Sequence, residues 1–161
     1  MHEDNTRIWE IVEKVKVGML TTKFSGGLRA RPVEARPDRD AGAIWFVTDV
    51  RAMKDDEIEV EPDVCFVMVD PAERAYLSIT GRASVSRDNS KAAAIWKKTD
   101  DVWWPGGSED PNVRVIRLEP IVAELWDGPS NSIIAAFEFA KARLTGGKPN
   151  LGENRKVKIA M

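Results

Sequence analysis

The chain has 161 residues, of which 43% are hydrophobic and 31% are charged, a composition typical of an ordinary soluble globular protein. This length predicts one domain over residues 1–161, with a polar tail from about residue 148 onward. The net charge of −2 provides no basic field for nucleic acid, and no apolar run approaches the roughly 20 residues that span a membrane. We therefore expect a cytoplasmic protein with neither nucleic acid nor a membrane as a partner.

The single histidine and the single cysteine limit the kinds of catalytic and metal site that the chain can form. The only histidine, His2, lies in a polar leader, so histidine-ligated metal sites and serine–histidine triads are not expected. The only cysteine, Cys65, lies in the apolar run 64–69, which predicts a buried, reduced thiol. No pair of carboxylates stands out as an acid–base couple. The acidic residues after the third strand are expected to form a solvated helix face: Asp55, Asp56, Glu57, Glu59 and Glu61.

In chain order, the sequence predicts a helix, about five strands with a helical excursion, two more strands and a last helix. The helices are expected over residues 6–17, 54–59, 89–98 with Asp88 as the N-cap, and from Asn131 or Ser132 to Leu144. The strands are expected over residues 18–24, 28–35, 44–47, 64–70, 75–87 with a bend at Gly81, 113–120 and 121–127, followed by an edge strand in the tail.

Hairpin-type links and bend glycines favour a mainly β (α+β) class, an antiparallel barrel with peripheral helices, over a doubly wound sheet. No G-x-G-x-x-G follows the first strand, so a Rossmann dinucleotide site is not expected. Pro32 removes a ladder donor, which places it at an edge, at a bulge or beside a gap that faces a ligand. Along the same strand, Arg31 and Val33 are expected to share one face.

The stretch 43–54, AIWFVTDVRAMK, places a hydroxyl at the end of a strand and an ammonium at the start of a helix. Thr48 and Lys54 therefore suit an oxyanion such as phosphate, although a turn-capping hydroxyl and a solvated lysine show the same spacing. Arg31 is expected on a strand that pairs with that of Thr48. Its guanidinium is either solvated, paired, or aimed at a phosphate or a planar heterocycle. Arg36, beside a proline, is expected at the surface.

Six tryptophans are many for this length. Trp9, Trp45 and Trp96 fit core faces. Trp103 and Trp104 lie in a loop rich in glycine and proline, where burial requires a ligand ring, a second subunit or the loop itself as a partner.

Several short motifs follow one another in a specific order along most of the chain. They are VGMLTT, RARPV, AIWFVTD followed by Lys54, YLSITGRASVSRD, WxxxxDxWWPGG, DPNVRVIRLEP, AELWD and AKARLTGG. In this order and spacing the chain resembles the pyridoxamine-5′-phosphate-oxidase-like flavin-binding split barrels, and most closely their general stress protein 26 branch.

The resemblance implies a split-barrel homodimer with FMN, or FAD in its place, in a cleft between the subunits. It implies that Arg31 contacts the flavin and that Thr48 and Lys54 hold the phosphate. The backbone of neighbouring residues would line the ring, and one tryptophan would come from the second subunit. The complete set of cofactor residues that the resemblance implies is Arg31, Pro32, Val33, Phe46, Val47, Thr48, Lys54 and Trp126.

The chain also departs from the oxidases. Ala52 and Met53 stand where the oxidases have a serine and an arginine, Arg36 replaces a lysine, and the C-terminal arginine and histidine that hold pyridoxal phosphate have no match. The resemblance therefore implies a stress-type flavin oxidoreductase with an unknown small-molecule substrate, without pyridoxamine-phosphate oxidase activity and with no assigned catalytic acid or base. Two alternatives stay open, a non-catalytic flavin-binding or sensing module and a split barrel for another planar cofactor such as a deazaflavin.

Overall fold

The computed structural model describes the chain except residues 1, 53, 129–131, 149, 151, 160 and 161. Its strands are β1 (Val17–Phe24), β2 (Gly27–Glu34), β3 (Arg36–Asp38), β4 (Ala43–Asp49), β5 (Asp63–Asp70), β6 (Ala75–Ser86), β7 (Val113–Asp127) and β8 (Glu153–Lys158). Its helices are α1 (His2–Val15), α2 (Lys54–Val60), α3 (Asn89–Ile95) and α4 (Ser132–Thr145), with single 3₁₀ turns at η1 (Val50–Ala52), η2 (Lys98–Val102) and η3 (Gly107–Glu109).

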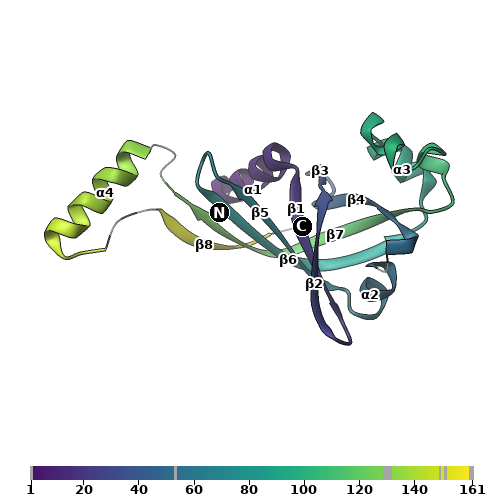
Figure 1. Ribbon diagram of the computed structural model, residues 1–161, viewed down its shortest axis with the longest axis horizontal. Helices are drawn as coiled ribbons and strands as arrows, with labels where there is room; N and C mark the ends of the chain where they lie inside the picture. Colours follow the sequence, from purple (N-terminus) through teal and green to yellow (C-terminus); the bar gives the residue numbers. More distant parts are fainter. Residues whose placement is uncertain (1, 53, 129–131, 149, 151, 160–161) are drawn as a thin grey trace.

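The strands form one antiparallel sheet that closes on itself (Figure 1). Its order is β2-β1-β5-β6-β7-β4-β3, and β8 adds to β7. β2 and β3 occupy the two ends of this order, yet only Ala35 separates them in the chain. Because consecutive residues cannot lie far apart, the two ends of the sheet must meet, which makes the sheet a barrel. The predicted mainly β, antiparallel class is confirmed.

Alternating side chains fill the barrel. In β6 every second residue from Ala75 to Ala83 is buried, as a sheet with one covered face requires. Phe46 and Phe66 meet edge to face inside the barrel, with ring centroids 5.1 Å apart. α1 closes the barrel with Ile8, a fully buried residue. A second, smaller core lies on the outside of the barrel beneath α3 and is made of Ala92, Trp104, Val113 and Val115.

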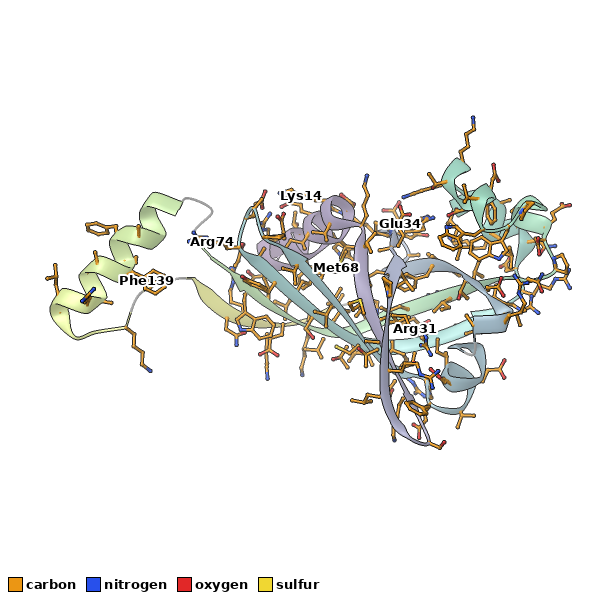
Figure 2. The ribbon with its side chains drawn as sticks, viewed as in Figure 1. Lys14, Arg31, Glu34, Met68, Arg74 and Phe139 are labelled. Atoms are coloured by element: carbon orange, nitrogen blue, oxygen red, sulfur yellow. The ribbon has the colours of Figure 1, made fainter. Side chains whose placement is uncertain are left out.

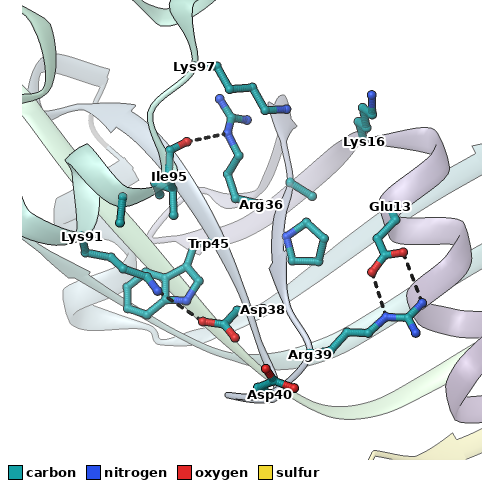
Figure 3. Close-up of a pocket in the computed structure, with 13 residues that line it drawn as sticks. Glu13, Lys16, Arg36, Asp38, Arg39, Asp40, Trp45, Lys91, Ile95 and Lys97 are labelled. Carbon is teal, nitrogen blue, oxygen red and sulfur yellow. Dashed lines mark hydrogen bonds and ion pairs between the residues drawn. The ribbon is translucent and has the colours of Figure 1, made fainter.

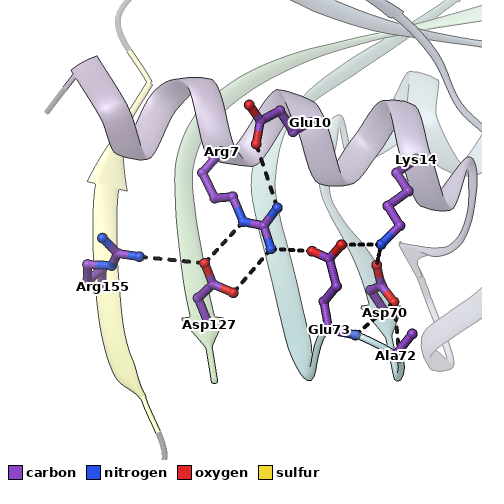
Figure 4. A network of polar contacts seen from close by, with 8 residues as sticks. All are labelled: Arg7, Glu10, Lys14, Asp70, Ala72, Glu73, Asp127 and Arg155. Atoms are coloured by element: carbon purple, nitrogen blue, oxygen red, sulfur yellow. Dashed lines mark hydrogen bonds and ion pairs between the residues drawn. The ribbon is translucent and has the colours of Figure 1, made fainter. Parts of the chain in front are cut away.

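Charged side chains hold α1 in place (Figure 4). Arg7 donates to Asp127 at 3.0 Å and to Glu73 at 2.6 Å. Lys14 pairs with Asp70 at 2.7 Å and also with Glu73. The hydrogen bonds from Lys14 hold the pKa of Asp70 and of Glu73 below their ordinary values. The network therefore joins the helix to the β5–β6 turn and to the end of β7, although its exposed pairs contribute little individually.

The expected break between strands 113–120 and 121–127 is wrong, since β7 runs without interruption through Pro120. The ladder pairs Thr80 with Val122 but Gly81 with Pro120, so Ile121 is an extra residue that forms a bulge. A bulge accommodates a residue without a backbone N–H, which explains why the proline does not end the strand. The irregularity predicted at Gly81, a bend or a bulge, is confirmed as this bulge, but β6 is not interrupted there.

The helix predictions hold in type and differ at some ends. Asp88 caps α3 by accepting a hydrogen bond from the Lys91 backbone N–H at 2.8 Å, as expected. α3 stops at Ile95 because Trp96 is extended, three residues short of the expected end. Gly146, with φ of +70°, follows α4 as predicted. The expected cap Asn131 lies outside the described residues.

Two further features concern the surface. Figure 1 shows α4 projecting away from the barrel, and Figure 2 shows its residue Phe139, which is exposed. Cys65 is half-buried rather than buried, with its Sγ atom 3.3 Å from the Ser78 hydroxyl. Within the described part of the chain, no helix is both long enough and apolar enough to cross a membrane.

Gly81→Ala should destabilise the fold. A Cβ atom at this position would lie 2.2 Å from the Glu119 carbonyl oxygen, so the β6–β7 bulge would have to shift. We expect a loss of about 1–3 kcal/mol in the free energy of unfolding, measured by urea denaturation. Gly147→Ala, where a Cβ meets nothing closer than 3.4 Å, is the matched control. Equal stability of the two variants would contradict this account of the bulge.

Candidate functional site

Six of the eight predicted site residues lie on β2 and β4, which face each other without a ladder. The expectation that the strands of Arg31 and Thr48 pair is wrong, because β2 pairs with β1, and β4 pairs with β3 and β7. The β3–β4 ladder starts at Asp38 opposite Ala43 and ends at Arg36 opposite Trp45. Beyond that pair the two strands separate, since β2 turns to follow β1.

The separation leaves backbone groups open on two facing edges. β2 has β1 on one side only, and β4 beyond Trp45 has β7 on one side only. N–H and C=O groups on such edges need another partner, either water or a ligand. Pro32 lies on the β2 edge opposite Met19, which confirms the prediction that it belongs at an edge.

Side-chain directions along the two strands agree with this view. Val33 is buried, and Pro32 is exposed, as the predicted alternation requires. Phe46 is fully buried in the barrel core, whereas Val47 packs outward against the second core. Any contact of Phe46 with a ligand at this edge would therefore be made by its backbone.

Arg31, which Figure 2 labels, is largely buried and is held by two partners. Its Nη1 donates to the Thr22 hydroxyl at 3.0 Å, and its Nη2 donates to the Glu57 carboxylate at 2.7 Å. The Thr22 hydroxyl also donates to that same carboxylate oxygen. The sequence left three possibilities for the Arg31 guanidinium: solvated, paired or directed at a ligand. The structure shows it paired, on the edge strand β2.

Glu57 corrects one sequence prediction. It was expected on a solvated helix face, but its side chain is only 7% exposed. α2 lies against β1 and β6, and this contact turns Glu57 toward the barrel. Burial raises the pKa of Glu57, but hydrogen bonds from Thr22 and Arg31 and the nearby charge of Arg29 outweigh it and leave the pKa below its ordinary value.

Beside Glu57 there is a hollow of about 450 Å³ between the β1–β2 hairpin and α2. Its lining residues are Lys23, Phe24, Ser25, Glu57, Val60 and Glu61. Arg29 lies at its edge, with its guanidinium 4.5 Å from the Phe24 ring centre and 3.4 Å from the Glu57 carboxylate.

Thr48 is the most informative member of the predicted set. The residue is 3% exposed, and its Oγ1 has no hydrogen-bond partner within the described part of the chain. A buried hydroxyl without a partner costs about 1–3 kcal/mol, so this atom marks a place where a polar ligand would gain binding energy. Lys54 begins α2, but its side chain lies outside the described residues and its predicted role stays a prediction.

The tryptophan loop packs on its own chain. Trp104 is buried, donates to Asp49 at 3.1 Å and lies 5.8 Å from the Trp96 ring. Hydrogen bonds from Arg51 lower the pKa of Asp49 to about 2. Trp103, by contrast, is exposed. Trp104 is therefore covered by residues of its own chain, and its burial requires neither a ligand ring nor a second subunit.

Trp126 lies elsewhere on the barrel. It is part of β7, opposite Tyr76 on one side and Asn154 on the other, and it is partly exposed. No contact in the described structure joins it to Arg31 or Thr48, so within one chain it stands apart from the predicted site.

A larger hollow of about 720 Å³ lies between α1, β3 and α3 (Figure 3). Its lining residues are Glu13, Lys16, Ala35, Arg36, Pro37, Asp38, Arg39, Asp40, Trp45, Lys91, Ala94, Ile95 and Lys97. Arg36 was expected at the surface but is buried. It donates to both oxygens of Asp100 at 3.0 and 3.1 Å, and to the carbonyl groups of Ile95 and Glu34.

Other cations of this hollow are also paired. Lys91 lies 3.3 Å from Asp38 and 4.3 Å from the Trp45 ring centre, and Lys97 pairs with Glu34. Each of these ammonium groups already has a carboxylate partner. The lining holds five cations and three carboxylates, and the partners Glu34 and Asp100 outside it bring the carboxylates to five. Little free positive charge is therefore left for a phosphate group.

The fold and this site define a class of protein, an antiparallel barrel that is split along one side between two strands. The family model for proteins described as "Pyridoxamine 5'-phosphate oxidase like" matches residues 3–150. The chain therefore belongs to the pyridoxamine 5′-phosphate oxidase-like family, as its motifs predict.

The chain is also similar to individual proteins. A solved structure of a general stress protein 26 from Jannaschia sp. CCS1 is 30% identical, with a TM-score of 0.80, covering 98% of this chain and 99% of that one. A general stress FMN/FAD binding protein from Xanthomonas citri is 24% identical, with a TM-score of 0.69, covering 79% of this chain and 90% of that one. The protein bli-3 of Neurospora crassa is 22% identical over 153 residues, covering 88% of this chain and 73% of its own.

Thr48→Val should leave the free protein at least as stable as the original. The substitution removes a buried hydroxyl that has no partner, so we expect a change between zero and a gain of about 1 kcal/mol in the free energy of unfolding. Thr22→Val is the matched control, because its hydroxyl is also buried but bonds Arg31 and Glu57, and its loss should cost about 1–2 kcal/mol. Equal losses in both variants would contradict the assignment of a free hydroxyl to Thr48.

Proposed function

We propose that this protein binds FMN along the facing edges of β2 and β4 and works as a flavin-dependent oxidoreductase of the stress-response type. The observation that carries the proposal is the buried, unpartnered Thr48 hydroxyl beside two strand edges that have no ladder between them. Family membership supports it, as does the name of the Xanthomonas citri relative, which is described as binding FMN or FAD.

The residues present fit such a cofactor. Thr48 would donate its hydroxyl to the phosphate, and Lys54 would add an ammonium from the start of α2. The open backbone groups around Pro32 and Val47 would meet the polar edge of the ring. Arg31 would offer the N–H groups that Thr22 and Glu57 do not occupy.

A bound flavin would supply hydride or electron transfer. The contribution of this chain is then to bind the cofactor, orient it and shield it from water. Oxidation of pyridoxamine phosphate is not proposed. Arg36 is committed to Asp100, and Ala52 offers no side-chain donor to a phosphate.

Purified protein should take up FMN and show flavin absorbance, and Lys54→Ala should bind FMN more weakly. Loss of a charge-assisted hydrogen bond to the phosphate costs about 1.5–3 kcal/mol, or roughly 10- to 150-fold in Kd. Kd is measured from quenching of flavin fluorescence, with Lys98→Ala, an exposed lysine of η2, as the control. Wild-type protein without flavin uptake would refute the proposal, and an unchanged Kd for Lys54→Ala would remove that lysine from the site.

The second candidate is a flavin-binding or sensing module without turnover. It is favoured by the surroundings of Thr48 and Arg31, which supply hydrogen bonds and no evident group that polarises a substrate. Reduction of the bound flavin by NAD(P)H, followed by rapid reoxidation by a small acceptor, would support the oxidoreductase. A split barrel that takes a deazaflavin would be recognised by preferential uptake of that cofactor over FMN.

We further propose that a homodimer forms through the outer face of β1, β5, β6 and β7. Apolar side chains stay partly exposed there on neighbouring strands, with Met19 opposite Val67, and Val69 opposite Tyr76, which is opposite Trp126. A contiguous apolar face of this kind is typical of an interface. A second copy on this face would also cover Trp126, the residue expected to act across the subunits.

Val67→Lys should therefore convert the dimer to a monomer, because a buried ammonium would have to be desolvated at the interface. Mass is measured by light scattering after gel filtration. Val102→Lys, at an exposed position of η2, is the control and should leave the dimer intact. A monomeric wild-type protein, or a dimeric Val67→Lys variant, would contradict this interface.

A further inference from the structure

The buried carboxylate of Glu57 has no role in the flavin site as proposed above. Glu57 is buried and lies on α2, next to the inward side chains of two paired strands. Thr22 comes from β1, and Arg31 comes from β2. Carboxylates are rarely buried unless their charge is paired and hydrogen-bonded.

The three side chains form a closed triangle of hydrogen bonds. Arg31 donates through Nη1 to Thr22 and through Nη2 to Glu57, while Thr22 donates to the same oxygen of Glu57. Each member fixes the orientation of the other two. A long arginine side chain on an edge strand has many rotamers, and this triangle selects one of them in the free protein. A ligand that binds Arg31 therefore pays little further entropic cost for ordering it.

The triangle also sets the local charge. The Arg31 and Glu57 groups are 2.7 Å apart and only 15% and 7% exposed. At this distance and burial, a carboxylate cancels most of the field of its partner at longer range. A neighbouring ligand thus meets directed N–H donors and little net positive charge from Arg31.

We propose that Glu57 is a positioning residue for Arg31, holding the guanidinium at the β2 edge and withdrawing its positive charge from the flavin. This inference rests on the proposed flavin site. Its consequence is electrochemical: reduction increases the electron density of the flavin ring, so a net positive neighbour favours the reduced form. Glu57 opposes that effect and keeps the midpoint potential low.

The test uses Glu57→Gln, which keeps the size of the side chain and an oxygen that accepts from Arg31 and Thr22, but removes the charge. FMN should bind more tightly, by about three- to tenfold, and its midpoint potential should become more positive. Glu59→Gln, an exposed residue of the same helix, is the matched control and should match the wild type. Arg31→Met is the opposite change: it leaves the Glu57 carboxylate without its main partner, so FMN should bind more weakly and its midpoint potential should become more negative.

A second variant separates geometry from charge and serves if Glu57→Gln fails to fold. Thr22→Val opens the triangle while both charges remain, so FMN should bind more weakly with a nearly unchanged potential. Unchanged Kd and potential in Glu57→Gln, with reduced stability alone, would show a purely structural pair and overturn the inference. Wild-type protein that takes up no FMN would overturn the flavin site itself, and this role of Glu57 with it.

Discussion

The fold depends on the segment β2–β3, which pairs with β1 in its first part and with β4 in its second. Residues of β2 pair with β1, and after the single residue Ala35 those of β3 pair with β4. The Ala35 N–H donates to the Lys16 carbonyl at 2.7 Å, which fixes the point of change at the start of β1. Because the same segment belongs to both ends of the sheet, it closes the barrel without a long crossing connection. No other part of the fold joins the two ends of the strand order in this way among the described residues.

The same constraint creates the candidate site. A segment that follows β1 as β2 cannot also follow β4, so the barrel wall opens where the two ladders diverge. The change of partner between β2 and β3 therefore both closes the barrel and opens the gap between β2 and β4. The polar residues then take up the positions that this opening offers, with Thr48 on one strand, Arg31 on the other and Glu57 on the helix between β4 and β5. The hollow between α1, β3 and α3 differs from this site, because Arg36, Lys91 and Lys97 there are already paired with carboxylates.

Local patterns in the sequence predict local structure well. The alternation of Arg31 with Pro32 gave the correct inward and outward faces, and the cap at Asp88 and the bend at Gly81 follow from the chemistry of single residues. Strand pairing could not be predicted in the same way. Strands that are neighbours in the sequence suggest a hairpin. The strand that pairs along most of β4 is β7, which lies more than sixty residues later in the chain. The burial of Arg36 is another long-range effect, since its partner Asp100 lies on a different element.

Glu57 shows the same limit at the site. In the sequence it is one of five acids around a short helix, and nothing in its spacing separates it from Glu59. Only the packing of α2 on β1 selects it. Thr22 carried a weak signal, because it continues the inward row of Leu20, where a polar residue requires a partner. The motif resemblance predicts Thr48 and Arg31 as site residues without this information, because it rests on the identity and order of residues and requires no knowledge of contacts.

The most direct test of the account is a crystal structure of the protein after saturation with FMN. We expect the phosphate within hydrogen-bond distance of the Thr48 hydroxyl, and the ring along the open edges of β2 and β4 near Arg31. FMN bound in the hollow between α1, β3 and α3, with the Thr48 hydroxyl still unpartnered, would contradict it.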